Sequence, residues 1–250
     1  ATLSVAASGN VTVNISTSGT GTEGTDYGSI SNITISAGST TGTASFTPSD
    51  DSTYEGNETA IVAISSVTGL ATEDGTQAVT ITITENESAP TVTLTSSASS
   101  IAENAGSSLT LTATLSGKTD EAVTVSITPT GTGTEGTDYG TISDITISAG
   151  STTGTVSFTP TDDTTYEGNE TAIVAITGVS GGSASESGTQ AVTLTIDENE
   201  DGPTVTLSSS ASSIAEDAGS SLTLTATLSV AASGNVTVNI STSGTGTEGT

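Results

Sequence analysis

The sequence repeats itself along its length, and this repetition restricts the fold more than any other feature. Tyr27 and Tyr139 stand 112 residues apart, and Pro90 and Pro203 stand 113 apart. Near the C-terminus, the sequence of 1–25 returns letter for letter after 225 residues. A fixed internal period of this length indicates tandem structural units, each folding as the next one does.

The alignment of the copies predicts three units, of which one is complete. We expect a unit over 1–89 that lacks its first strand and most of its second, a complete unit over 90–202, and the N-terminal part of a third unit, three strands long, over 203–250. Because the chain begins and ends at the same point of the period, we expect a window from a longer tandem array. The alternative is a segment whose ends simply cut through two units.

Apolar and polar residues alternate within the complete unit at intervals of two, the period of a half-buried strand. The expected strands lie at Thr91–Thr95, at Ser108–Ser116, at Ala122–Thr128, around Ile145 and Ile147, around Val156 and Phe158, from Ala172 to Ile176, and from Val192 to Ile196. Turns containing Gly, Ser or Asn separate them. Seven strands in one unit of this length predict an all-β fold, in which immunoglobulin-like antiparallel β-sandwiches follow one another as beads on a string.

Acidic residues dominate the charge of the chain. It carries 28 Asp and Glu, one Lys or Arg and no His, which gives a formal net charge of −27. Nucleic acids and anionic membranes are bound through Lys and Arg, so this composition excludes both as partners. No run of apolar residues approaches the roughly 18 that a membrane helix needs, so we expect no membrane span in this segment.

Groups suited to catalysis are scarce. The chain has no His or Cys, and its one Lys, Lys118, lies in an expected turn beside Asp120 and Glu121. Paired carboxylates can hydrolyse glycosides, but such sites usually need aromatic platforms. The six aromatic residues of this chain all fall at repeated core positions. We therefore expect that the protein is not an enzyme.

One acidic stretch occurs twice, as DDTTYEGNE at 162–170 and as DDSTYEGNE at 50–58. Each copy places four carboxylates within nine residues, with no basic residue nearby. Two like charges about 4 Å apart repel by about 1 kcal/mol in water and by several times more near a protein surface. Either the stretch is splayed in solvent, or a cation holds it together.

The expected fold brings further carboxylates to this stretch, because turns after alternate strands of an antiparallel sandwich lie at the same end of the domain. In the complete unit, the candidate ligands are Glu103, Asp138, Asp162, Asp163, Glu167, Glu170, Asp197, Glu198 and Glu200. Their counterparts elsewhere are Asp26, Asp50, Asp51, Glu55, Glu58, Glu85, Glu87 and Glu216. Ca²⁺ takes six to eight oxygen ligands, whereas Mg²⁺ prefers few protein ligands and retained waters. We therefore predict Ca²⁺ at this end of each unit; the alternative is a solvated acidic cap.

These residues resemble those of the Calx-β repeat family, known from the calcium-binding domains of sodium–calcium exchangers and from large bacterial surface proteins. The resemblance covers essentially the whole chain. It rests on the Gly-Thr-Asp-Tyr segment Gly136–Tyr139, the Asp-Asp-x-x-Tyr-Glu-x-x-Glu stretch at 162–170, and the acidic run Asp197–Asp201 that closes the last strand. It implies calcium ligands at the candidate positions, with a backbone carbonyl near Thr165 as a further ligand.

Together these features predict a non-enzymatic segment of a long extracellular filament or adhesin stalk at the cell surface, stiffened by calcium at the repeat junctions. Near-identical tandem copies, the absence of Cys and strong acidity also resemble bacterial surface adhesins, such as the long filaments of gliding marine bacteria. The expected partners are neighbouring repeats of the same chain, together with lateral contacts between filaments. The alternative function is a calcium-responsive adhesive module that itself binds a ligand.

Overall fold

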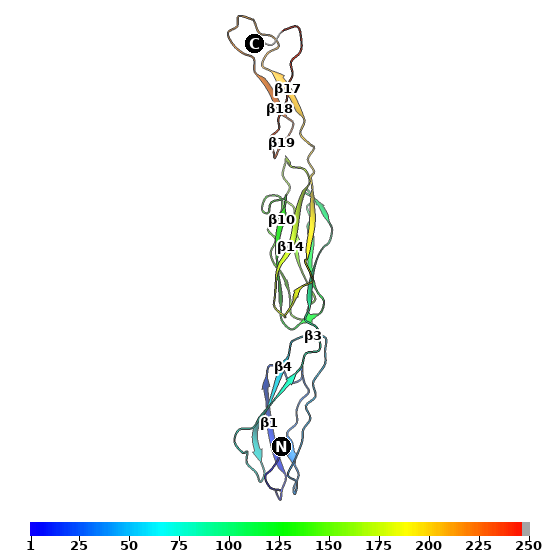
Figure 1. Ribbon diagram of the computed structural model, residues 1–250, viewed down its shortest axis with the longest axis vertical. Coiled ribbons are helices and arrows are strands. Elements are labelled where there is room, and N and C mark those ends of the chain that lie inside the picture. The colour runs from blue at the N-terminus through cyan, green and yellow to red at the C-terminus, as the bar shows by residue number, and fades with distance from the viewer. Residues whose placement is uncertain (247–250) are drawn as a thin grey trace.

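The computed structural model describes residues 1–246 as an elongated, all-strand molecule with its repeats arranged end to end (Figure 1). The first repeat lies at one end, the complete repeat in the middle, and the third at the other end. No helix in the described part of the chain is long and apolar enough to cross a membrane. We call 1–89 the first repeat, 90–202 the complete repeat and 203–246 the described part of the third repeat.

The complete repeat is a sandwich of two sheets, as the alternation predicts. One sheet has the order β11 (Ile145–Ile147), β10 (Val123–Gly131), β14 (Glu170–Ser180), β16 (Ala191–Asp197) and β7 (Ser100–Ala102). The other has the order β12 (Thr153–Phe158), β8 (Leu109–Leu115), β6 (Thr91–Ser96) and β15 (Ser185–Glu186). All seven predicted strands are therefore confirmed.

The short strand β7 is an element that the alternation did not predict. It follows β6 in the chain but pairs with β16 in the opposite sheet, and this pairing is parallel, with Ile101 opposite Ile196. The chain therefore changes sheets between β6 and β7. A three-residue strand is too short to show an alternating pattern, so the sequence predicts a turn at this crossing. It places Glu103, which follows β7, beside the end of β16.

Inward-facing side chains of both sheets form one continuous core in the complete repeat. On β8, Leu109, Leu111 and Leu115 are buried while the Thr residues between them face outward. Tyr139 and Phe158 stack at the end of this core, with ring centroids 4.9 Å apart. A β-branched and aliphatic interior between two sheets about 10 Å apart is the expected source of stability for such a fold.

The first repeat contains one sheet of the sandwich. Its order is β2 (Ile33–Ile35), β1 (Val11–Gly19), β4 (Glu58–Thr68) and β5 (Ala78–Ile83), which matches the first four strands of the larger sheet in the complete repeat. The facing sheet is not formed within the described residues. As a result, only Val11, Val13 and Ile35 make up its buried cluster.

Within itself, the third repeat pairs two strands, β17 (Val205–Ser209) with β18 (Leu224–Leu228). The segment Val236–Ile240, which alternates as a strand would, is not a strand in the structure. The counterpart of this segment in the complete repeat is β10, which is paired on both sides by β11 and β14. Without such neighbours the alternating residues have no backbone partners, and alternation alone does not form a strand.

Consecutive repeats touch through short parallel strand pairs. At the first junction, β3 (Thr53–Tyr54) pairs with β9 (Lys118–Thr119) of the next repeat. At the second junction, β13 (Thr165–Tyr166) pairs in the same way with β19 (Ala231–Ala232). In each case the strand of the preceding repeat belongs to the repeated acidic stretch. Contact with the neighbouring repeat is therefore made by the segment that carries the candidate ligands.

Candidate metal centres

The loop that carries Asp138 is held in place by the aromatic core. Tyr139 is buried and forms bridges to Glu135 and to Pro160. Around it, the backbone N–H of Asp138 donates to the carbonyl of Thr134 (2.9 Å), and the Asp138 side chain accepts from the Thr134 N–H (2.6 Å). This tight turn leaves the Asp138 carboxylate at the end of the sandwich, in a nearly buried position.

The acidic stretch 162–170 forms a turn that is organised by carboxylates accepting backbone hydrogen bonds. Asp163 Oδ1 accepts from the Thr165 N–H at 2.6 Å, which shapes the start of β13. Gly168 follows with a φ of 77°, a left-handed conformation that glycine adopts without steric cost. The Gly168 N–H then points to Glu198 Oε2, at 2.8 Å.

Glu198 is the centre of this turn, because its carboxylate joins the stretch to the end of β16. Its Oε2 accepts from the N–H groups of Glu167 (2.6 Å) and Gly168, and its Oε1 accepts from those of Asn199 (3.0 Å) and Glu200 (3.1 Å). Partial burial alone would raise its pKa, but these backbone hydrogen bonds hold the pKa of Glu198 at about 2. Glu198 is therefore charged at any physiological pH.

Two groups of three carboxylates result at this end of the complete repeat. In the first, which we call the inner cluster, oxygens of Asp138, Glu167 and Glu170 lie within 4.8 Å of one another. In the second, the outer cluster, the same holds for Glu103, Glu198 and Glu200. These are six of the nine candidates predicted in this repeat, and they come from four separate segments of the chain.

The free carboxylates of these clusters oppose one another electrostatically. Burial, followed by the charge of Asp138, raises the pKa of Glu170 to about 7. Burial likewise raises the pKa of Glu103 to about 7, with further contributions from Glu198 and Glu200. The pKa of Glu167 is also raised, first by burial and then by Asp138. A bound cation would oppose these shifts, because its positive charge stabilises the ionised carboxylates and offsets their mutual repulsion.

One oxygen of the outer cluster lacks any partner. Glu200 Oε2 is shielded from solvent and has no hydrogen-bond partner among the described residues. An unpaired, shielded carboxylate oxygen costs free energy unless something coordinates it. It points to a ligand that supplies positive charge, and the donor set consists entirely of oxygens, which suits a hard cation such as Ca²⁺.

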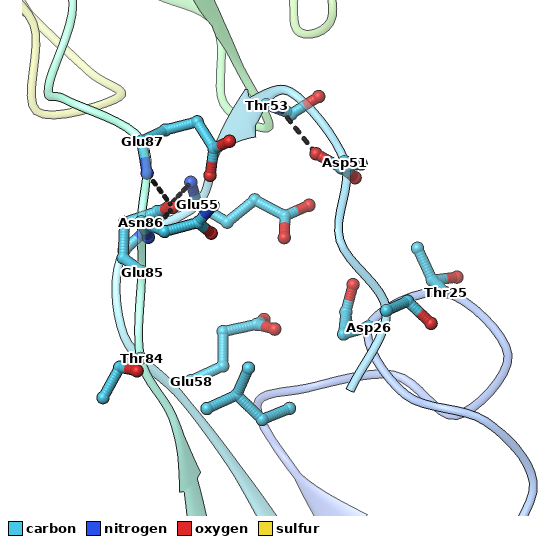
Figure 2. A pocket seen from close by; sticks show the side chains of 13 residues that line it. Thr25, Asp26, Asp51, Thr53, Glu55, Glu58, Thr84, Glu85, Asn86 and Glu87 are labelled. Carbon is cyan, nitrogen blue, oxygen red and sulfur yellow. Dashed lines mark hydrogen bonds between the residues drawn. The ribbon is translucent and has the colours of Figure 1, made fainter. Parts of the chain in front are cut away.

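The first repeat builds the inner cluster again, from Asp26, Glu55 and Glu58. Figure 2 shows Glu55 and Glu58 of the acidic stretch 50–58 and Asp26 of a separate loop around the same space. Burial and the charge of Asp26 raise the pKa of Glu55 to about 7. Glu85 repeats the role of Glu198, accepting from the N–H groups of Glu55 (2.6 Å) and Gly56 (2.8 Å).

The remaining predicted residues lie around the clusters rather than in them. Asp163 borders the outer cluster, since its N–H donates to Glu103 Oε1 (3.2 Å), and Asp197 accepts from the Asn169 amide (3.3 Å). Asp51 and Glu87 line the pocket that contains the first inner cluster. The charge of Asp162 contributes to the raised pKa of Glu200. In the first repeat, Asp50 accepts a hydrogen bond from the Asn86 amide (3.0 Å). Thr165 is the first residue of β13, and Glu216 is exposed in the third repeat.

One residue near the first inner cluster was not predicted. Asp120 belongs to the complete repeat, yet its N–H donates to the carbonyl of Tyr54 in the preceding repeat (3.4 Å). Its charge contributes to the raised pKa values of Glu55 and Glu58, after burial and the charge of Asp26. The sequence could have indicated Asp120, because in tandem units the far end of one repeat meets the acidic end of the repeat before it. At the second junction the same position is Ser233, whose N–H donates to the Tyr166 carbonyl (3.2 Å).

Comparisons with known proteins bear on the family of this chain. Two crystal structures are similar to it. CBD12 from CALX1.2 is 14% identical, and the match covers 79% of this chain and 90% of that chain with a TM-score of 0.34. The calcium binding domain CBD12 of CALX1.1 is 13% identical, and the match covers 76% of this chain and 88% of that chain with a TM-score of 0.32. A search of curated proteins finds no matching sequence. The sequence profile of the Calx-beta domain matches residues 2–87, 85–199 and 197–250. The chain therefore belongs to the Calx-beta domain family, as three tandem segments.

Proposed function

We propose that this chain is a non-catalytic, structural segment of a long extracellular filament or adhesin stalk, in which Ca²⁺ bound at the repeat junctions stiffens the array. The observation that carries the proposal is the double role of the acidic stretch. The same residues that bring Glu55 to the inner cluster also form β3, the strand that pairs with β9 of the next repeat. The second junction repeats the arrangement with Glu167 and β13.

The physical link between metal and junction is the order of this stretch. Each junction pairing involves two residues from each repeat, Thr53–Tyr54 with Lys118–Thr119 and Thr165–Tyr166 with Ala231–Ala232. So short a pairing is weak by itself. Mutual repulsion of the free carboxylates favours conformations in which the stretch opens, and these conformations break the pairing. A cation held by three carboxylates removes the repulsion and limits the opening, so it also restricts bending between repeats.

Ca²⁺ suits these clusters better than other common metals. The ligands available are carboxylates, carbonyls and Asn amides, which hard cations prefer, and the chain has no His or Cys for zinc or copper. Three carboxylates in one cluster exceed the one or two that Mg²⁺ usually takes from a protein. A segment outside the cell or at its surface would need only the millimolar-to-submillimolar affinity that is typical of extracellular calcium modules.

The test is the stiffness of the chain with and without calcium. We expect small-angle scattering of residues 1–250 to give a larger maximum dimension in millimolar Ca²⁺ than in a chelator, while millimolar Mg²⁺ has a much smaller effect. The variant Glu58→Gln/Glu170→Gln removes one carboxylate from each inner cluster and should lose the calcium effect. Glu73→Gln changes a half-buried acid outside the clusters; it is the matched control and should retain the calcium effect. Identical scattering in calcium and chelator would contradict the proposal.

A further inference from the structure

The two junctions of the chain have the same backbone contacts but different linkers. We propose that Gly202 makes the second junction the hinge of the molecule, so that the first and the complete repeat move together while the third repeat swings about residue 202. The inference concerns the covalent linkers and does not depend on a bound metal. It therefore goes beyond the proposed calcium function.

The backbone contacts at the two junctions are equal in kind and in number. At each one, two residues of the acidic stretch pair in parallel with two residues of the next repeat. One further hydrogen bond follows each pairing: the Asp120 N–H donates to the Tyr54 carbonyl (3.4 Å), and the Ser233 N–H donates to the Tyr166 carbonyl (3.2 Å). A pairing this short has little stability of its own. How often each junction opens therefore depends on the linker that joins the two repeats.

The linkers differ just before a proline that both contain. The first linker is Ser88-Ala89-Pro90, and the second is Asp201-Gly202-Pro203. A proline restricts the residue before it, in part by a clash with the Cβ of that residue. Ala89 has a Cβ and is held to extended conformations, whereas Gly202 has none and keeps a wider choice. The second linker therefore has more conformations available once its junction opens.

The closed second junction does not itself require a glycine. The φ angle of Gly202 lies outside the left-handed region that favours glycine. The residue lies against the ring of Tyr166, where an added Cβ would be 3.6 Å from Cζ and 3.8 Å from Oη, an ordinary van der Waals separation. An alanine would fit this backbone and pack on the ring. The effect of Gly202 is therefore on the open state, which it favours through its conformational freedom.

The size of this effect is sufficient to matter for so short a pairing. Replacing Gly by Ala at a position whose backbone accepts it reduces the entropy of the open chain and shifts such an equilibrium about two- to fivefold. The second junction should thus be open about two to five times more often than the same junction with an alanine at 202. The first junction already has this alanine, in Ala89.

The other differences between the junctions concern charge. Asp201 stands where the first linker has Ser88, and Lys118 and Asp120 stand where the third repeat has Ala231 and Ser233. The three charged residues are all exposed, so salt screens their interactions beyond about 8–10 Å. The freedom of Gly202 is not screened. We therefore assign the hinge to the glycine, and the tests below separate it from the charge of Asp201.

A hinge at one of two joints has a consequence for the shape of the molecule. The three repeats follow one another end to end (Figure 1). With the hinge at 202, the first two repeats keep this arrangement while the direction of the third varies. Calcium would then restrict the second junction more than the first; this consequence rests on the proposed calcium function, whereas the hinge does not.

The first test follows junction opening through amide hydrogen exchange, measured by NMR on the 250-residue chain in chelator. Gly202→Ala should slow the exchange of the Ser233 amide about two- to fivefold, because the junction opens less often. Ala89→Gly should speed the exchange of the Asp120 amide by a similar factor. Neither substitution alters the residues next to the reporting amide, so its intrinsic exchange rate is unchanged. Unaltered rates in both variants would overturn the proposal.

Two control variants separate the hinge from other causes. Gly178→Ala, on β14, is also a glycine whose added Cβ meets only an ordinary contact, 3.8 Å from Ser126 Cβ, and it should leave the exchange of Ser233 unchanged. Asp201→Ser removes the charge of the second linker and retains its glycine, so it should slow the exchange of Ser233 less than Gly202→Ala does. An equal slowing by Asp201→Ser would assign the opening to charge and reject the hinge.

The second test measures bending, and it uses the absence of Cys from the chain for site-specific spin labels. Equivalent exposed positions span the junctions: Ser16→Cys/Thr93→Cys the first, and Thr128→Cys/Thr206→Cys the second. By double electron–electron resonance in chelator, we expect Gly202→Ala to narrow the distance distribution across the second junction. Ala89→Gly should broaden the distribution across the first. Each variant is compared with the parent at the same junction, so differences between the flanking repeats cancel. An unchanged distribution at the second junction would contradict the hinge.

The two proposals fail separately. If calcium and chelator give identical scattering while Gly202→Ala slows the exchange of Ser233, the hinge stands and the calcium function falls. If calcium stiffens the chain but Gly202→Ala leaves both the exchange and the distances unchanged, the hinge falls and the calcium function stands.

Discussion

The first and the complete repeat carry almost the same residues but differ in what they bury and in how many acidic clusters they build. Both form the inner cluster, from Asp26, Glu55 and Glu58 in one and from Asp138, Glu167 and Glu170 in the other. The complete repeat alone forms an outer cluster within the described residues, because Glu103 reaches it on the strand β7 that the first repeat lacks.

The comparison shows that the two clusters have different structural requirements. The inner cluster needs one sheet and its turns, since it forms on a repeat whose second sheet is missing. The outer cluster needs the crossing from β6 to β7, and therefore the closed sandwich. Closing the sandwich should therefore raise both the stability of the repeat and the number of ions that it can bind.

The largest difference should appear on removing the same aromatic ring from each core. Phe158 is completely buried against Tyr139, whereas Phe46, stacked on Tyr27 in the same way, is half-buried. We expect Phe158→Ala to lower the free energy of unfolding of its repeat by about 3–5 kcal/mol, and Phe46→Ala to cost clearly less. Chemical denaturation followed by Tyr fluorescence measures both. Equal losses would mean that the first repeat is as tightly packed as the complete one.

Calcium should stabilise the complete repeat more than the first. A site saturated a hundredfold above its dissociation constant adds about 2.7 kcal/mol, and the complete repeat offers two clusters where the first offers one. In calorimetry we expect the transition of the complete repeat to rise further on moving from chelator to millimolar calcium. A single common shift would show that the outer cluster binds nothing.

Glu103→Gln should make the complete repeat resemble the first. In chelator we expect this variant to be more stable than the parent by about 1 kcal/mol, because it removes repulsion between Glu103 and its neighbours Glu198 and Glu200. In calcium we expect the order to reverse, because one ligand of the outer cluster is lost. Thermal melts in the two conditions measure the change of sign. If the variant and the parent had the same order of stability in both conditions, Glu103 would have a structural role and would not be a calcium ligand.

The smallest expected effect concerns the two junctions. Asp120 adds a negative charge beside the first inner cluster, whereas Ser233 is neutral at the second junction. Asp120→Ser should weaken cation binding at the first inner cluster by less than about 1 kcal/mol, a few-fold in affinity. Ser233→Asp should have the opposite effect at the second. Tyr-sensitised terbium luminescence, titrated with calcium, measures both. No change in either variant would mean that the next repeat touches this site only through its backbone and does not affect cation binding.

Much of the fold could be predicted because it depends on local pattern. The alternation on β8 and β10 shows which side chains face inward, and the structure buries Leu111 and Val125 as expected. The short strands β7 and β9 could not be predicted in this way, since two or three residues carry no period. The segment around Val238 is the opposite case: its residues alternate, but it forms no strand, because the neighbouring strands of the sheet are missing.

The candidate ligands were predicted as one acidic end, and the structure divides them into groups. Sequence order shows that Glu103, Asp138 and Glu198 follow strands that end on the same side. It does not show that Asp138 belongs with Glu170, or that Glu103 belongs with Glu198. Side-chain grouping depends on which loops lie next to each other, and β7 decides this by changing sheets.

By itself, the sequence determined the repeat period, the all-β architecture, the identity of the core side chains and the segments that carry carboxylates. These features follow from spacing along one strand or one turn, where neighbours in sequence are neighbours in space. Only the tertiary structure decided which carboxylates share a cluster and that Asp120 of one repeat approaches Glu55 of another. These features depend on contacts between distant segments, whose pairing is set by how strands cross between sheets and how repeats meet end to end.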